Sequence, residues 1–375
     1  MTNPTIDAQE HRRVFHALDA ARGIAALVVV LYHLPIAFRG PLFGSGELAV
    51  DFFFGLSGFV LAHAYLARLA SGHMGVREFM VARVVRLYPL YLISLLTLLV
   101  LLAGVGLAGL PTLWSATAMA GKLPFALLML PSPTLDSSAY LYPFNIAAWS
   151  IFLELAVNLL FVLVCRQVSR PGFRWTLIGI SGALLAVQIA MQDMLGGSAW
   201  NTLASGILRV CFSFFLGIQI HEWLKHRHAA RPVHSAWCLL ALAVLLAIIC
   251  APEQHWLKLA AIFVLFPVLM MVLGRSDVPR GLAGTALRKL GVLSYAIYMM
   301  HGPVLYAWVW LYLTPDVQAD ESLLLAIPIL GCVVLAAWMA DRFFDMPVRA
   351  RINRRLRDRR SRREPSTAPT RTRAS

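Results

Sequence analysis

Polar side chains interrupt the apolar segments of this sequence at a few places where they could do chemistry. His33 lies near the end of the first apolar segment, Asp51 opens the second, and Glu154 lies in the fourth. A histidine that is neutral near pH 7 can accept a proton from a hydroxyl group. Ionisable groups are costly inside apolar segments, so each of these residues is a functional candidate, although a buried histidine bonded to a backbone carbonyl is the plainer interpretation of His33 alone.

Three arginines could hold a ligand that carries phosphate. Arg83 and Arg86 are spaced to face one way on a helix, and Arg22 shares the first apolar segment with His33. At 1.5 Å per residue, Arg22 and His33 lie about 16 Å apart along a helix and cannot pair directly. Anchoring at a membrane surface is the alternative explanation for all three arginines.

The remaining candidates are side chains that could bind a substrate, and they are Ser57, Trp149, Arg209, Tyr295 and His301. Residues 55–58 (GLSG) miss the nucleophile-elbow pattern by one position, so we interpret their glycines as close helix packing or an opening for a ligand. Tyr295 and His301 share one face of a helix. Such a face could bind a substrate, or it could simply pack against a neighbouring helix. The five cysteines form no Cys-x-x-Cys pair, and we expect no metal site.

The composition identifies the environment of these residues. The chain has 375 residues, of which 59% are hydrophobic and 14% charged, with a net charge of +14. A soluble domain carries about 25% charged residues, so the composition excludes a soluble enzyme, a disordered chain and a small disulfide scaffold. The apolar residues instead fall in blocks of about 20 residues, the length that crosses a bilayer.

These blocks predict an all-α, polytopic membrane helix bundle of about ten transmembrane helices. The predicted spans are 18–36, 50–70, 88–109, 145–166, 175–195, 203–221, 236–251, 258–274, 290–312 and 322–344. The stretch 110–144 is broken by prolines and predicts a long loop with a re-entrant or interfacial piece.

The distribution of Lys and Arg predicts the orientation. The loops after spans two, four, six and eight are basic, whereas the loops after odd-numbered spans hold only Arg39 and Lys122, with Lys258 at a boundary. Both termini are therefore expected in the cytoplasm. This topology puts Arg22, Arg83 and Arg86 at the cytoplasmic mouth, and His33, Asp51 and Glu154 in the outer part of the membrane.

We expect residues 1–348 to form one integral-membrane domain and residues 349–375 a basic, disordered tail that contacts anionic lipids rather than nucleic acid.

The candidate residues occur in an ordered set of motifs that resembles the integral-membrane acyltransferase-3 family. The matching pieces are residues 18–23 (LDAARG) with His33, 50–59 (VDFFFGLSGF), 83–89 (RVVRLYP), 149–150 (WS) with Glu154, 293–298 (LSYAIY) with His301, and 344–349 (FDMPVR). Each motif alone is weak evidence for the family, whereas the complete set in this order is specific to it. This chain has Val157-Asn158 where many members have an aromatic pair.

The resemblance implies an O-acyltransferase of a bacterial inner membrane that moves an acyl group, typically acetyl, from cytosolic acetyl-CoA or another acyl-CoA. The acceptor would be a hydroxyl of a carbohydrate, glycolipid or natural product. His33 would be the general base, Arg22, Arg83 and Arg86 would hold the donor's phosphates, and Glu154 or Asp51 would orient His33 or bind sugar hydroxyls.

A secondary transporter or flippase is the alternative function, because His33, Asp51, Glu154 and Arg209 could also form a proton or substrate pathway. Such proteins often have two symmetric halves with interrupted helices, and no inverted repeat is visible in this sequence. A non-catalytic membrane scaffold would leave the ordered polar residues unexplained.

Overall fold

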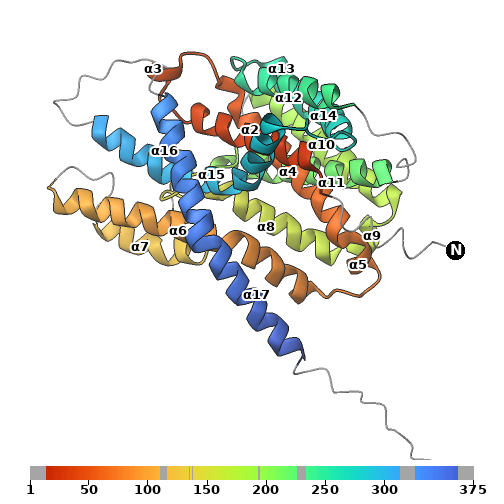
Figure 1. Ribbon diagram of the computed structural model, residues 1–375, viewed down its shortest axis with the longest axis horizontal. Coiled ribbons are helices and arrows are strands. Elements are labelled where there is room, and N and C mark those ends of the chain that lie inside the picture. The colour runs from red at the N-terminus through yellow and green to blue at the C-terminus, as the bar shows by residue number, and fades with distance from the viewer. Residues whose placement is uncertain are drawn as a thin grey trace, which may run out of the picture.

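The protein is a helix bundle, as the sequence predicts (Figure 1). The computed structural model describes residues 14–109, 116–134, 136, 138–192, 195–225, 234–312 and 326–361. Within these ranges the chain forms helices and no strand, with one isolated β-bridge between Tyr140 and Ala199.

The helices of the first half follow the predicted spans closely. In order they are α2 His16–Tyr32, α3 Ile36–Arg39, the 3-10 turn η1 Gly44–Leu48, α4 Ala49–Leu61, the π-helical turn η2 Ala62–Leu66, α5 Ala67–Ala70, α6 Val76–Leu107, α7 Ala116–Leu127, α8 Ala148–Leu163, α9 Cys165–Val168 and α10 Pro171–Gln192.

The second half continues in the same way. Its elements are the 3-10 turn η3 Trp200–Thr202, α11 Leu203–Lys225, α12 Ser235–Cys250, α13 His255–Ala260, the π-helical turn η4 Ala261–Leu265, α14 Phe266–Leu273, α15 Leu282–Tyr312, α16 Ala326–Met339, the π-helical turn η6 Ala340–Asp345 and α17 Met346–Ser361. Each predicted span coincides with helix in its described part, whereas residues 193–194 of the fifth span and 322–325 of the last span lie outside the described ranges.

Six helical segments of the described residues are long and apolar enough to cross a membrane, so the chain is a multi-pass membrane protein. They are Gly44–Ala70, Val76–Leu107, Pro171–Met191, Trp200–Lys225, His255–Leu273 and Ala326–Asp358, and Ala148–Leu163 and Ser235–Cys250 are shorter apolar helices. The count of ten spans and the side of the termini stay predictions.

The segment between α6 and α8 folds back onto the bundle. The short helix α7 packs along α6, where the hydroxyls of Tyr88 and Tyr91 donate to carbonyls near the end of α7 at 2.6 Å each. The following loop enters the core, since Leu141 is fully buried and Asn145 is 3% exposed. The amide of Asn145 donates to Ser94 and to the backbone of α15. As a result, α8 begins inside the molecule.

Glycines allow a close approach of helix backbones at two crossings in the described part of the chain. A Cβ on Gly58 of α4 would collide with the Phe214 carbonyl of α11, and one on Gly217 of α11 would collide with the Gly55 carbonyl. In the same way, a Cβ on Gly23 of α2 or Gly291 of α15 would collide with the backbone of the other helix. Small residues let helix backbones approach in this way, as we expected of Gly55 and Gly58.

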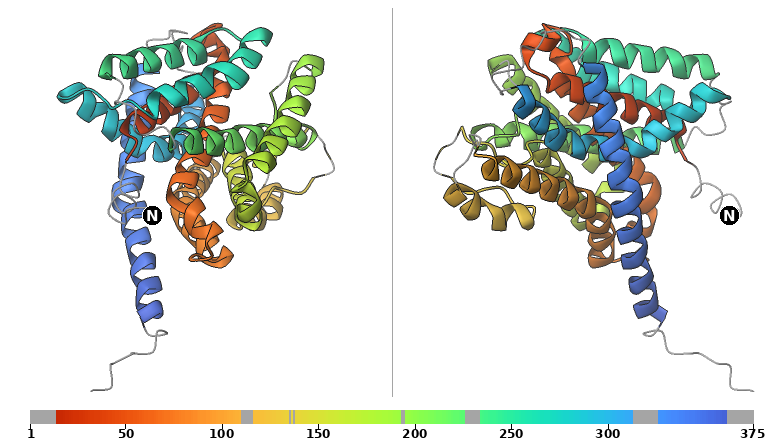
Figure 2. Two further views of the ribbon diagram at one scale, coloured as in Figure 1. Left: turned by 90° about the vertical axis from the view of Figure 1, so that its right-hand side faces the viewer. Right: turned by 60° about the vertical axis from the view of Figure 1, so that its left-hand side comes forward.

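The last three elements form one long rod. Figure 2 shows α16, η6 and α17 running down one side of the bundle and past its end. The disorder predicted for the tail is wrong for residues 349–361, which belong to α17. Arg is a good helix former, and the Arg349 guanidinium pairs with the buried Asp345 carboxylate one turn earlier at 2.9 Å. Residues 362–375 lie outside the described ranges.

The α4–α11 crossing gives a test of the packing. We expect G58A to destabilise the protein by about 1–3 kcal/mol, because the added methyl group forces the two backbones apart. Thermal unfolding in detergent, followed by size-exclusion chromatography, measures this effect. G179A is the matched control, since a Cβ on Gly179 of α10 meets nothing within 4 Å. Equal stability of G58A and the wild type would contradict the close crossing.

Candidate active site

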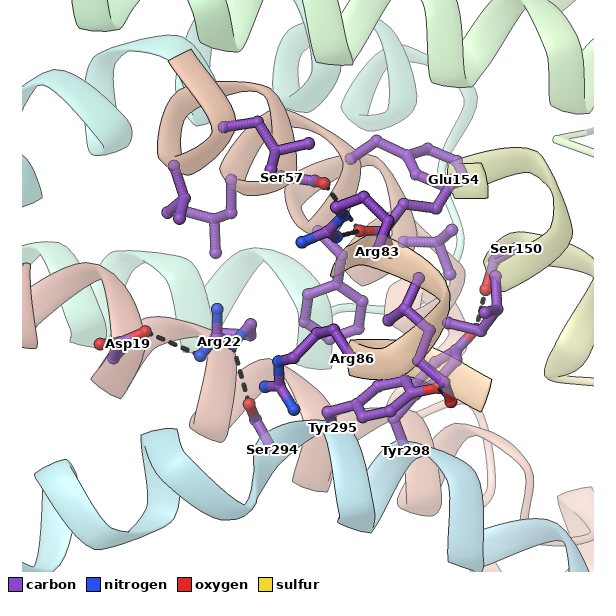
Figure 3. A pocket seen from close by; sticks show the side chains of 18 residues that line it. Asp19, Arg22, Ser57, Arg83, Arg86, Ser150, Glu154, Ser294, Tyr295 and Tyr298 are labelled. Atoms are coloured by element: carbon purple, nitrogen blue, oxygen red, sulfur yellow. Dashed lines mark hydrogen bonds and ion pairs between the residues drawn. The ribbon is translucent and has the colours of Figure 1, made fainter. Parts of the chain in front are cut away.

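A cavity of about 300 Å³ lies between α2, α4, α6, α8 and α15 (Figure 3). Its polar lining comes from side chains that are far apart in the sequence, namely Asp19, Arg22, Ser57, Arg83, Arg86, Ser150, Glu154, Ser294, Tyr295 and Tyr298. Phe53, Phe54, Leu56 and other apolar residues line the rest. A second cavity of about 210 Å³ adjoins it, because Asp19 and Arg22 line both.

Two of the three predicted arginines are held by carboxylates. Arg22 bonds Asp19 at 2.7 Å, and its Nε donates to Ser294 Oγ at 2.8 Å. Arg83 Nη2 lies 2.8 Å from Glu154 Oε1. The same carboxylate oxygen accepts a hydrogen bond from Ser57 at 2.7 Å. These contacts fix both guanidinium groups and neutralise part of their charge.

Arg86 differs from the other two arginines. Its guanidinium lies 5.5 Å from the centre of the Tyr295 ring, and within the described part of the chain it has neither an ion pair nor a hydrogen bond. Figure 3 shows dashed contacts at Arg22 and Arg83 and none at Arg86. The N–H groups of Arg86 are therefore available for an anion inside the cavity.

The structure places Glu154 differently from the sequence expectation. We expected it in the outer part of the membrane, as one of two carboxylates that could orient His33 or bind sugar hydroxyls, but it lies against Arg83 in the cavity. The reason is the loop before α8, which carries the start of this helix into the core. The second turn of α8, which carries Glu154, therefore lies inside the bundle and reaches the cavity.

A row of rings leads from the cavity to His33. Tyr298 lines the cavity, bonds Ser150 through its hydroxyl at 2.7 Å and packs on Phe53 at 5.6 Å between ring centres. The His301 ring lies 5.7 Å from Tyr298 and 4.9 Å from His33. His33 itself does not line the cavity. The structure thus brings Tyr295, Tyr298 and His301 of one helix face between the arginines and His33.

The protonation of His33 is set by its position at the end of α2. The residue is exposed, and its Nδ1 lies 2.8 Å from the Val29 carbonyl. A carbonyl oxygen can only accept, so the proton of the neutral ring is on Nδ1. The free lone pair is then on Nε2, which is the atom that can act as a base.

Asp51, Arg209 and Trp149 form a separate buried group. Arg209 donates to both oxygens of Asp51, at 3.1 and 2.7 Å, and the two side chains are 2% and 1% exposed. Arg209 also bonds the Gly196 and Glu47 carbonyls, and it lies 5.5 Å from the Trp149 ring. Neither Asp51 nor Glu154 bonds His33, so the structure supports neither carboxylate as its orienting partner.

Sequence reasoning missed further ionisable residues inside the bundle. Lys258 is 2% exposed and pairs with Glu253 at 2.5 Å and with Glu47 at 3.8 Å. His63 and His221 lie 3.3 Å apart through ring nitrogens. The criterion used for His33, an ionisable residue in an apolar span, would also have found His63 and His221. No sequence signal pairs Lys258 with its carboxylates.

Comparisons with known proteins agree with the predicted resemblance. Residues 15–340 match the family model Acyl_transf_3, described as an acyltransferase domain. "Protein 2 in picA locus" of Rhizobium radiobacter is 37% identical over 190 residues, which cover 48% of this chain and 95% of that protein. "Acyltransferase MdmB" of Streptomyces mycarofaciens is 30% identical over 277 residues, which cover 68% of this chain and 67% of that protein. No solved structure matches.

The buried Asp51–Arg209 pair can be tested as a structural element. We expect D51L to cost about 3–5 kcal/mol of stability, because it leaves the Arg209 charge buried without a partner. The double variant D51L/R209M removes both charges and should regain much of that loss in thermal unfolding. A D51L protein that is as stable as the wild type, yet inactive, would instead support the catalytic role that we first expected for Asp51.

Proposed function

This chain belongs to the acyltransferase-3 family of membrane acyltransferases, and on that premise we propose that it moves an acyl group from an acyl-CoA to a carbohydrate hydroxyl. The donor is acetyl-CoA in the simplest case, and the acceptor is a cell-surface glycan, a glycolipid or a glycosylated natural product. The observation that carries the proposal is the arginine cavity next to a row of rings that ends at His33, in which Arg86 has no carboxylate partner among the described residues.

The arginine cavity suits the nucleotide end of the donor. Guanidinium groups bind phosphate through paired N–H donors, and Arg86 has its donors available. Arg83 Nε is also buried, and the part of the chain that the structure describes offers it no hydrogen-bond partner. The adjoining cavity shares Arg22 and adds the ring of Phe15, which gives a donor as large as coenzyme A further room. We propose that the protein lies in a bacterial inner membrane, with this donor arriving from the cytosol.

His33 suits the role of general base. Its Nε2 would take the proton of the acceptor hydroxyl while the hydroxyl oxygen attacks the thioester carbon. The carbon–sulfur bond then breaks, and the proton passes to the leaving thiolate. Because Tyr298 and His301 lie between the cavity and His33, the acyl end of the donor must pass the Ser150–Tyr298 contact to reach the base.

The role of Arg86 predicts a change in donor affinity. We expect R86Q to weaken the binding of coenzyme A to the purified protein by about 10- to 100-fold, since a charge-assisted contact to phosphate is lost. Calorimetric titration in detergent measures the affinity. R77Q is the matched control, because Arg77 begins the same helix, is exposed and does not line the cavity. Equal losses in R86Q and R77Q would show a general charge effect and contradict a phosphate site at Arg86.

The role of His33 predicts a loss of acyl transfer without a loss of protein. We expect H33A to lower transfer by at least about 100-fold at a normal level in the membrane. Mass spectrometry of envelope glycans and secreted metabolites, from cells that make the wild type or H33A, measures the added acyl mass and identifies the acceptor. H73A, at an exposed histidine away from the cavity, should match the wild type. Substrate flux across vesicles without release of coenzyme A would contradict the enzyme and favour the transporter alternative.

A further inference from the structure

Two imidazole rings meet beside the proposed base. His33, at the end of α2, and His301, in the middle of α15, have ring centres 4.9 Å apart, with planes inclined at 48°. Their helices are the pair that the glycines Gly23 and Gly291 hold in close contact. The contact between the two rings lies about three helical turns along the same pair of helices from these glycines.

One ring nitrogen of His301 is a buried hydrogen-bond acceptor without a donor among the described residues. Its Nδ1 lies 2.6 Å from the Tyr298 carbonyl, so Nδ1 holds the proton of the neutral ring and Nε2 holds the lone pair. The residue is 1% exposed, and Nε2 has no hydrogen-bond partner among the described residues. A buried acceptor without a partner is costly, and such atoms in a folded protein call for a physical explanation.

A change in the charge of His33 supplies that explanation. Each ring is held by a backbone carbonyl through Nδ1, a contact that a neutral ring can make. When His33 takes up a proton it becomes a cation in contact with a neutral ring that has an unused lone pair. The attraction between the cation and that ring exists only after proton transfer begins. Interactions of this kind lower a barrier, because they are stronger in the transition state than in the ground state.

We propose that His301 is a positioning residue that stabilises the imidazolium form of His33 during acyl transfer. The proposal rests on His33 being the general base. The proton moves from the acceptor hydroxyl to His33 Nε2 and then to the leaving thiolate, and His301 keeps its own proton on Nδ1 throughout. His301 thus acts on the reaction through His33 and does not itself have to touch the substrate.

The other groups around His33 make such a partner useful. The titratable and charged groups that face His33, among the residues described, are His301 from α15, Tyr32 from α2 and Arg39 from α3. The Arg39 guanidinium lies over the Tyr32 ring, which in turn packs edge-on against His33. The charge of Arg39 opposes a second positive charge on His33, so the neutral acceptor from α15 offsets an unfavourable neighbour.

Chemical modification of His33 tests this inference without a known acceptor. Diethyl pyrocarbonate reacts with neutral imidazole, so peptide mass spectrometry across a pH series gives the midpoint at which His33 loses its proton. We expect H301L to move this midpoint about one unit toward lower pH, because the charged form has lost its stabilising neighbour. H301Q, which retains a carbonyl acceptor on the side chain, should stay within a few tenths of the wild type. The exposed His73 is the internal reference, and its midpoint should be the same in every variant.

The pH dependence of acyl transfer is a second test of the role of His301. Once the acceptor substrate is identified, the rate of transfer can be measured across a pH series. We expect H301L to lower kcat by about tenfold and to move the acidic limb of the kcat/KM profile to lower pH. The affinity for coenzyme A should stay unchanged. H301Q should recover most of the rate. A midpoint for His33 that is the same in the wild type and H301L would overturn the inference, as would equal losses of rate in H301L and H301Q.

The two proposals can fail separately. If the wild type transfers no acyl group to any acceptor, the proposed function fails. A shifted His33 midpoint in H301L would then show that the two rings interact, but not that their interaction serves acyl transfer. If the wild type is active and the midpoint does not move, only the role of His301 fails. Thermal unfolding of both His301 variants shows whether a loss of rate comes from a loss of the fold.

Discussion

Charge pairing inside an apolar bundle is the constraint on which the rest of this structure depends. A lone charge taken out of water is very costly, so the bundle must bring partners together across distant helices. Three arginines meet this requirement with carboxylates, through Arg22–Asp19, Arg83–Glu154 and Arg209–Asp51. The Arg83 and Arg209 pairs tie together helices that lie far apart in the sequence.

The groups that the proposed chemistry uses are among those left unpaired in the described part of the chain. Arg86 lines the cavity without a carboxylate partner there, and the neutral rings of His33 and His301 each present an Nε2 lone pair while Nδ1 is bound to the backbone. The residues in charge pairs have a structural role, since they hold in place the helices that carry Arg86, His33 and His301. Glu154 orients Arg83 at the wall of the cavity, and Asp51 neutralises Arg209 deeper in the bundle.

Much of the helical fold could be predicted from the sequence, because the length and apolar character of a span are local properties. Every predicted span coincides with a helix, and Gly55 and Gly58 pack closely as expected. The pairing of charges could not be predicted, since Asp51 and Arg209 are 158 positions apart and no local pattern joins them. The depth of Glu154 depended on a loop that folds into the core, and the helical start of the tail depended on the Asp345–Arg349 contact.

In the proposed reaction the arginine cavity receives the donor's phosphates while the acyl end of the donor reaches His33. A structure of the protein with bound coenzyme A, determined by electron cryomicroscopy, would show both ends of the donor. We expect phosphate oxygens within hydrogen-bond distance of Arg86, and the thiol sulfur beyond Tyr298 on the side of His33. A bound coenzyme A whose phosphates lie away from Arg22, Arg83 and Arg86, or whose sulfur points away from His33, would contradict it.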